Sequence, residues 1–196
     1  MPVYDSPARE AAPLKILIAG GFGVGKTTLV EAVSEIEPLR TEERLTAAGV
    51  GVDDLDGIES KTVTTVAMDF GRITLTDAGV VLYLFGTPGQ ERFWFMWDDL
   101  LNGALGAIVL VDTRRLDRSF PAVDFFENRG LPFVVAANCF HGEQLYTAEE
   151  IGAALHLRDP NTPVLMLDAR SRHDVRDALL SLLDLLIAKA KTSESV

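Results

Sequence analysis

Cysteine is nearly absent from this 196-residue chain, and positive charge is scarce. The single Cys139 excludes a disulfide within the chain and fits a reducing compartment. The 18 Lys and Arg residues stand against 29 Asp and Glu, which gives a net charge of −11, and they are scattered along the chain. Binding to a nucleic-acid backbone needs a clustered basic face, so this balance argues against nucleic acid as a partner.

Long apolar runs are missing too. No stretch reaches about 18 apolar residues, the length that a membrane-spanning helix needs. The first residues lack a signal-type apolar segment, and the last ones lack a prenylation cysteine. We therefore expect a cytoplasmic protein with no direct membrane insertion, which reaches a membrane only if a partner recruits it.

The hydrophobic content of 47% suits one domain, and a chain of this length buries roughly 70% of its unfolded surface. Three prolines among the first 13 residues predict a flexible leader over 1–13. We expect the ordered domain over 14–190 and a flexible tail over 191–196.

Residues 20–27 read Gly-Gly-Phe-Gly-Val-Gly-Lys-Thr, which matches the phosphate-binding pattern G-x-x-x-x-G-K-[ST]. An apolar strand-like segment precedes the motif and a helix-like segment follows it, as the mechanism requires. The loop N–H groups would face the phosphates at the positive end of the helix dipole. Lys26 would reach the β- and γ-phosphates, and Thr27 would place its hydroxyl on Mg²⁺. The residues expected to contact the nucleotide here are Gly21, Gly23, Val24, Gly25, Lys26, Thr27 and Thr28.

The remaining pattern predicts a doubly wound α/β sheet that is mostly parallel. A polar stretch over 37–60 indicates a surface loop. Two strand-like segments over 65–76 and 80–85 flank a turn at 77–79, so they should form one antiparallel hairpin. Later apolar runs are typical of buried parallel strands, and the last segment is a helix with an apolar stripe. These runs cover 104–111, 131–138 and 164–167, and the helix covers 172–190.

Residues 86–93 read Gly-Thr-Pro-Gly-Gln-Glu-Arg-Phe, which resembles the switch II signature D-T-A-G-Q-E-R-F of the Ras superfamily. Residues 65–70 resemble the switch I segment T-I-G-V-D-F of Rab-like GTPases. The segment 138–141 stands where the superfamily has N-K-x-D, and 168–170 stands where it has S-A-K. The resemblance covers about 14–190, and within the superfamily the chain looks like the bacterial MglA-type small GTPases, closest to the actinobacterial conservon (CvnD-type) GTPases.

This resemblance implies a Ras-like G domain, a P-loop NTPase that binds GTP or GDP with Mg²⁺ and acts as a switch. It makes Thr65 the second Mg²⁺-coordinating hydroxyl, with Thr64 as the runner-up, and gives Gln90 the role of orienting the attacking water beside Lys26. It also implies nucleotide contacts from Gly89, Asn138, His141, Asp168, Ala169 and Arg170. No arginine finger can be assigned, so we expect slow hydrolysis, an activating protein that supplies an arginine, and a roadblock-domain partner.

Two positions depart from the superfamily pattern. Gly86 replaces the aspartate that holds a water on Mg²⁺. Counting back through a turn centred near residue 78 sets Gly86 opposite Phe70, with Asp69 one position away. Asp69 either supplies the missing carboxylate or merely ends a strand on the solvent side.

The second departure is His141, which replaces the aspartate that accepts two hydrogen bonds from guanine. A neutral imidazole offers one acceptor at most, which weakens guanine specificity, and Cys139 removes the lysine stem that covers the base. Asn138 and the Ala169 N–H could still favour guanine, so we expect GTP ahead of ATP.

Five large apolar residues occupy 93–97, more than one helical stripe can bury. Either some of them are exposed as an interface, or all pack in the core. Rival functions are a degenerate nucleotide-binding module with little or no hydrolysis and a small P-loop kinase, for which no arginine-rich lid is visible.

Overall fold

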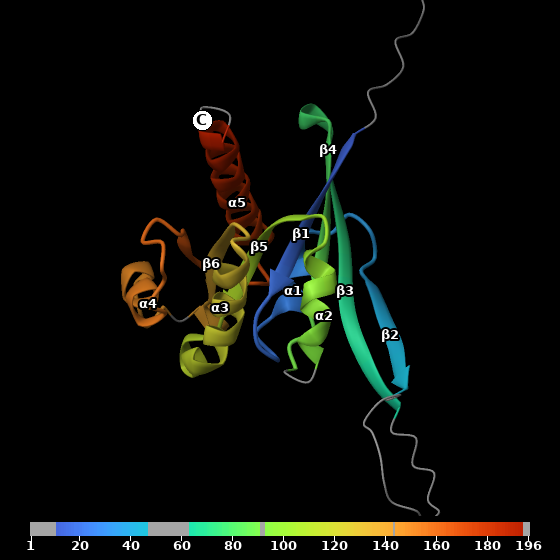
Figure 1. The fold of residues 1–196 in the computed structure, drawn as a ribbon, viewed down its shortest axis with the longest axis horizontal. Helices are drawn as coiled ribbons and strands as arrows, with labels where there is room; N and C mark the ends of the chain where they lie inside the picture. Colours follow the sequence, from blue (N-terminus) through green and yellow to red (C-terminus); the bar gives the residue numbers. More distant parts are fainter. Residues whose placement is uncertain (1–10, 47–62, 91–92, 143, 194–196) are drawn as a thin grey trace, which may run out of the picture.

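The computed structural model describes residues 11–46, 63–90, 93–142 and 144–193. Its centre is a seven-stranded sheet in the order β2-β3-β4-β1-β5-β6-β7, with helices on both faces (Figure 1). β3 is antiparallel to both of its neighbours, and the other pairs are parallel. This confirms a mostly parallel α/β sheet with one antiparallel strand. The strands are β1 Ala12–Ala19, β2 Leu39–Thr46, β3 Val63–Leu75, β4 Val80–Gly86, β5 Ala104–Val111, β6 Phe133–Asn138 and β7 Val164–Leu167.

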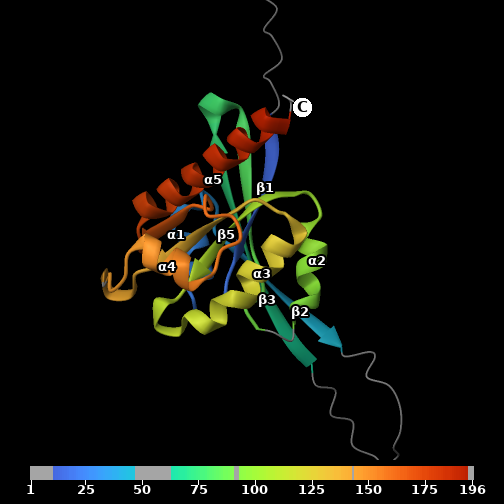
Figure 2. The ribbon, with the colours of Figure 1, turned by 60° about the vertical axis from the view of Figure 1, so that its left-hand side comes forward.

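Two helices cover one face of the sheet and three cover the other (Figures 1 and 2). Alternating residues of β1 supply both cores, with Ile16 and Ile18 facing α1 and α5, and Leu17 and Ala19 facing α2, α3 and α4. The α-helices are α1 Lys26–Val33, α2 Phe95–Leu101, α3 Phe120–Arg129, α4 Ala148–Ala154 and α5 Arg172–Ser193. None of the helices in the described residues is both long and apolar enough to cross a membrane.

The predicted loop over 37–60 was wrong in its first part, because β2 forms there. β2 lies at the edge of the sheet and pairs only with β3, so its charged sequence is compatible with a strand. Residues 47–60 of that stretch lie outside the described residues. Two elements extend past the predicted ones: Ala12 already pairs with Val80 in β1, and α5 continues to Ser193, beyond the predicted end of the last helix at 190.

The hairpin of β3 and β4 has a register one residue away from the predicted one. A short 3-10 helix, η1 (Thr76–Ala78), precedes Gly79 in the left-handed region at φ 62°, and Phe70 pairs with Phe85. Continuing this register puts Asp69, not Phe70, opposite Gly86. The two residues are close, since a Cβ added at Gly86 would lie 3.1 Å from the Asp69 Oδ2 atom.

The apolar residues at 93–97 are divided between core and surface. Trp97 is 2% exposed, and its Nε1–H donates to the Pro88 carbonyl at 3.0 Å, whereas Phe95 is 63% exposed. Phe93 is buried as well. The prediction that part of this run stays exposed is therefore confirmed for Phe95, and Trp97 is a core residue.

Candidate nucleotide-binding site

The glycine loop joins the carboxyl end of β1 to α1. β1 lies between β4 and β5, where the connections along the chain change from one side of β1 to the other, and α/β sheets bind ligands at such a point. α1 has no side-chain cap and no acidic residue in its first turn, unlike α4, which carries a full capping box. Its first N–H groups and positive dipole end are thus available to an anion. Gly25 precedes the helix at φ 108°, and a Cβ there would lie 2.7 Å from the Asn138 Nδ2 atom, so only glycine fits.

Lys26 curls back over the loop that it follows. Its Nζ donates to the carbonyl oxygens of Gly20 at 2.9 Å and Gly21 at 2.8 Å. Burial of the ammonium group lowers the pKa of Lys26 to about 8, although the Asp69 carboxylate acts in the opposite direction. A partly desolvated cation at this position favours an anionic ligand.

Thr27 and Asp69 meet at the base of the loop. The Thr27 hydroxyl donates to the Asp69 Oδ2 atom at 2.7 Å, and Asp69 is only 9% exposed. Of the two interpretations that the sequence left open, the solvent-side one is wrong, because the carboxylate points to the phosphate loop; that Asp69 supplies the missing carboxylate stays a prediction. The structure therefore brings two of the three predicted metal-site residues together.

The third predicted metal-site residue, Thr65, is not brought to this pair. Its backbone belongs to β3 and pairs with Arg44, and its side chain lies outside the described part of the structure. Thr65 is four residues from Asp69 along one strand, which corresponds to about 13 Å. Thr64, the runner-up, pairs with Leu45 still closer to the far end of the hairpin. A shared metal would require this part of β3 to move.

The segment after β4 lies directly over the phosphate loop. A Cβ added at Gly89 would meet the Lys26 Nζ at 2.6 Å, the Gly21 carbonyl oxygen at 2.9 Å and the Phe22 Cα at 2.9 Å. The structure thus brings Gly89 to the loop that the sequence assigned to phosphate, and the role of the following Gln90 stays a prediction. Residues 91 and 92 of this motif lie outside the described residues.

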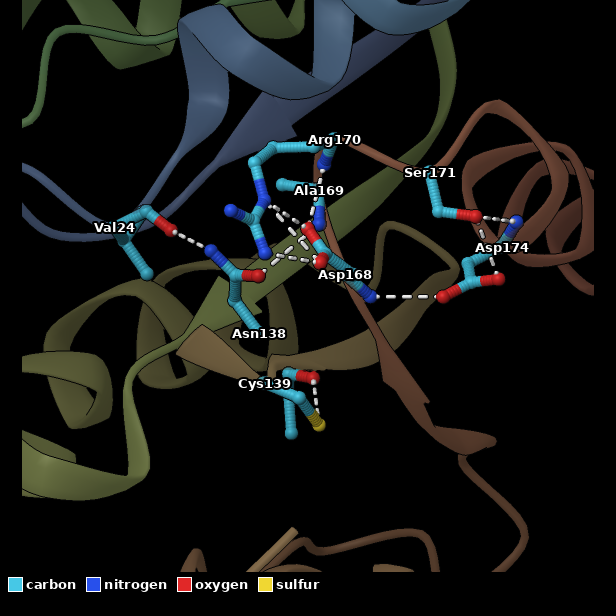
Figure 3. Close-up of polar contacts among 9 residues, drawn as sticks. Val24, Asn138, Cys139, Asp168, Ala169, Arg170, Ser171 and Asp174 are labelled. Carbon is cyan, nitrogen blue, oxygen red and sulfur yellow. Dashed lines mark hydrogen bonds and ion pairs between the residues drawn. The ribbon is translucent and has the colours of Figure 1, made fainter. Parts of the chain in front are cut away.

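Asn138, at the end of β6, holds three segments together (Figure 3). Its Nδ2 donates to the Val24 carbonyl at 2.9 Å, and its Oδ1 accepts from the Ala169 N–H at 3.1 Å. Both polar groups of its amide are therefore engaged within the protein. In this structure the Ala169 N–H donates to Asn138, so it would have to leave Asn138 to reach guanine, and its contact with the base stays a prediction.

Asp168 and Arg170 form an ion pair beside Asn138 (Figure 3). The Arg170 Nη2 lies 2.6 Å from the Asp168 Oδ2, and the Arg170 Nε lies 2.9 Å from Oδ1. The pairing raises the pKa of Arg170. Asp174 also stabilises this loop, because its carboxylate accepts hydrogen bonds from the Asp168 N–H and from the Ser171 hydroxyl.

A hollow of about 180 Å³ opens between the phosphate loop and the loops after β6 and β7. Its lining contains seven of the predicted nucleotide contacts and one residue that sequence reasoning missed, Phe140. The lining residues are Gly23, Gly25, Thr28, Asn138, Phe140, Asp168, Ala169 and Arg170. Larger hollows exist, such as one of about 480 Å³ between α4 and β7, but they lie away from the phosphate loop.

Phe140 belongs to a stack that the sequence did not indicate. The Arg114 guanidinium carbon lies 3.7 Å from the centre of its ring, and Arg114 is held by two hydrogen bonds of 2.8 Å to the Asp112 carboxylate. These bonds keep the pKa of Asp112 below its usual value. Cys139 is buried, which raises the pKa of its thiol, and its side chain points away from Asn138 and Asp168 (Figure 3). The side chain of His141 lies outside the described part of the structure.

Comparison with known proteins shows similarity to nucleotide-binding proteins. The family model described as "Conserved hypothetical ATP binding protein" matches residues 18–189. Ras-related protein Rab-7b of Homo sapiens is 30% identical over 155 residues, which cover 79% of this chain and 66% of Rab-7b. An uncharacterized protein of Methanocaldococcus jannaschii is 29% identical over 127 residues, 64% of this chain and 69% of that protein. The chain thus spans about two thirds of the length of these relatives.

Solved structures share the fold. The G domain of the T. maritima FeoB iron transporter matches with a TM-score of 0.58 and 18% identity, over 91% of this chain and 99% of that domain. This likeness shows the fold alone. The homology is shown by the family model and the relatives that match in sequence. The chain belongs to the family described as conserved hypothetical ATP binding proteins, and it is a nucleotide-binding G-domain protein homologous to the Ras-related small GTPases.

Proposed function

We propose that this protein is a small Ras-like GTPase that binds GTP and GDP with Mg²⁺ and works as a nucleotide-dependent switch. The observation that carries the proposal is the convergence on one loop of Lys26, the Thr27–Asp69 pair and Gly89. A buried lysine and uncapped helix N–H groups bind phosphate, while a hydroxyl with a carboxylate suits a hard cation.

The Thr27–Asp69 pair fits Mg²⁺ in the absence of the usual aspartate. Mg²⁺ is held in such enzymes by few protein ligands, with phosphates and waters completing its shell. Thr87, next to Gly86, is 2% exposed, and its hydroxyl has no hydrogen-bond partner among the described residues, so a metal-bound water could satisfy it. When bound, Mg²⁺ would neutralise charge on the phosphates.

Hydrolysis would then depend on positioning. Lys26 and the loop N–H groups would hold the phosphates, and Gln90 would orient the attacking water. Thr65 would reach the metal only after part of β3 shifts, and a segment that the γ-phosphate and Mg²⁺ reposition in this way would act as a switch. No motif supports an arginine of this chain at the γ-phosphate. We therefore propose slow hydrolysis that an activating protein accelerates by supplying an arginine, an effect on the order of 10³–10⁵ in rate.

The alternative is a degenerate module that holds GTP or ATP with little or no turnover. Gly86 and His141 favour it, and the family description refers to ATP. Calorimetric titration with GTP, GDP and ATP, with and without Mg²⁺, separates guanine from adenine specificity and tests the metal. A hydrolysis assay with Gln90→Leu as the control then separates a slow GTPase from a module without turnover. Absence of Mg²⁺-dependent guanine-nucleotide binding would refute the GTPase proposal.

We propose that a partner contacts the switch segment at the exposed Phe95, since aromatic residues are enriched at protein interfaces. By resemblance we propose a roadblock-domain protein as this partner, in the cytoplasm or recruited to a membrane through it. Phe95→Ala should weaken nucleotide-dependent binding to a roadblock-domain protein in a co-purification assay. Equal binding with GTP and GDP, or no effect of the variant, would contradict this proposal.

A further inference from the structure

The hollow beside the phosphate loop has two charged lining residues, Asp168 and Arg170. If phosphates occupy the loop as proposed above, the base must lie in this hollow, because Gly25 and Thr28 form its wall on the phosphate side. In a hollow of this kind a few polar groups recognise the base, because a base that does not match them leaves them without a hydrogen bond. Each polar group of the lining can therefore be tested for its capacity to read a base.

The other conspicuous lining groups cannot discriminate between bases. Asn138 uses one amide N–H on Val24 and one lone pair of its amide oxygen on the Ala169 N–H, which fixes the amide within the protein. Its second N–H is left for an acceptor such as N7, which guanine and adenine share, so it does not tell the two bases apart. Phe140 offers an apolar ring, which can stack on any base. Outside this lining, His141 stands at the superfamily's base-reading position, and a neutral imidazole has at most one acceptor.

Asp168 has what those groups lack. A carboxylate carries two oxygens with about four acceptor sites, and the Asp168 side chain is 27% exposed at the edge of the hollow. One of its partners, the Arg170 guanidinium, is 63% exposed, and such a pair gives way at low cost. The loop itself does not depend on this ion pair, because Asp174 accepts from the Asp168 N–H at 2.9 Å and from the Ser171 hydroxyl at 2.8 Å.

From this arrangement we propose that Asp168 determines base specificity, in place of the aspartate missing at position 141. Its carboxylate accepts from N1–H and the 2-amino group of guanine, and Arg170 turns to donate to O6. Adenine has no donor at N1 and carries an amino group where Arg170 needs an acceptor, so it is rejected. The inference rests on the proposed nucleotide-binding function and assigns the guanine selectivity of that same site.

Asp168→Asn is the decisive variant. Asparagine has the same shape and still offers Oδ1 to the Arg170 N–H, which Asp168 accepts at 2.9 Å, so the loop is preserved. Its amide can donate to the 2-oxo group of xanthine but not accept both guanine donors. We expect calorimetry with Mg²⁺ to show GDP affinity reduced by about 10–100-fold, the equivalent of one hydrogen bond to a charged group, with XDP bound more tightly than GDP. In the wild type, IDP, which lacks the 2-amino group, should bind about tenfold more weakly than GDP.

A matched control brackets this result. Asp184→Asn removes an exposed carboxylate on α5 outside the hollow, so it should keep the wild-type order GDP, IDP, XDP. An Asp168→Asn protein that keeps the preference of GDP over XDP overturns the inference. So does an equal loss of all nucleotides, which would indicate a ribose or loop role. Wild-type protein that binds no guanine nucleotide refutes the proposed function itself, a result distinguishable from both.

Discussion

Asp69→Asn is expected to weaken Mg²⁺ binding in the nucleotide complex without unfolding the protein. The Asp69 carboxylate accepts from the Thr27 hydroxyl at 2.7 Å, and asparagine keeps both the shape and one acceptor oxygen. The variant therefore removes charge while the contact persists. Loss of a carboxylate that supports a metal ligand typically lowers metal affinity by 10–100-fold, or about 1.4–2.7 kcal/mol.

Asp69→Ala separates this effect from packing. It leaves the nearly buried Thr27 hydroxyl without its acceptor and opens space against Gly86, so it should also destabilise the free protein by about 1–3 kcal/mol. The asparagine variant should change the free energy of unfolding by less than about 1 kcal/mol. Mg²⁺ titration of the GDP complex, together with urea denaturation of the free protein, measures the two quantities independently.

The register of β3 and β4 allows a reciprocal exchange. A Cβ at Gly86 would lie 3.1 Å from both Cβ and Oδ2 of Asp69, so Gly86→Asp alone should be unfavourable through crowding and like charge. Combined with Asp69→Gly, it moves the carboxylate across one strand pair and should recover most of the Mg²⁺ affinity. An unchanged Mg²⁺ titration in Asp69→Asn would refute the reasoning, whatever the double variant does.

Three further predictions concern the frame of the site. Trp97→Ala should cost about 3–5 kcal/mol in urea denaturation, because the side chain is buried and hydrogen-bonded, whereas Phe95→Ala should stay within about 0.5 kcal/mol; similar costs would contradict the assignment of core and surface. Burial raises the pKa of Cys139, so iodoacetamide should label it slowly at neutral pH in the folded protein and rapidly in urea; fast labelling of the native chain would disprove its burial. Hydrogen bonding from Arg114 lowers the pKa of Asp112 below 3.8, so this pair stabilises the fold above about pH 4 and the contribution is lost as pH falls through the lowered value; Asp112→Asn should show less loss of stability on acidification than the wild type.

Local patterns predicted the parts of the fold that local sequence determines. The runs at 104–111 and 164–167 became β5 and β7 without change of bounds, because buried parallel strands need continuous apolar sequence. β2 was missed since an edge strand can be charged. The hairpin register was missed by one residue because it depends on turn geometry, and the chain closes it with η1 and a left-handed Gly79.

The sequence predicted the motifs of the site but not the contacts between segments that lie far apart in the chain. Lys26 and Thr27 follow from one octapeptide, whereas Asn138 contacts Val24 across 114 positions of sequence, which no local pattern encodes. The stack of Arg114 on Phe140 likewise joins segments from different strand ends. Such contacts depend on which strands are neighbours, and the sequence pattern alone did not order them.

The roles proposed for the Asp69 and Asp168 carboxylates have the same physical basis. Asp69 lies on the strand beside Gly86, and Asp168 follows the strand beside the one that leads to His141. Adjacent strands are about 4.8 Å apart, so a carboxylate can move to the neighbouring strand and still reach the same ligand atom. Because one acts at the metal and the other at the base, their effects should be separable. Asp69→Asn should alter Mg²⁺ dependence and keep GDP ahead of XDP, and Asp168→Asn should do the reverse. A variant that changes both properties together would show that it acts through the fold of the site instead of through its own contact.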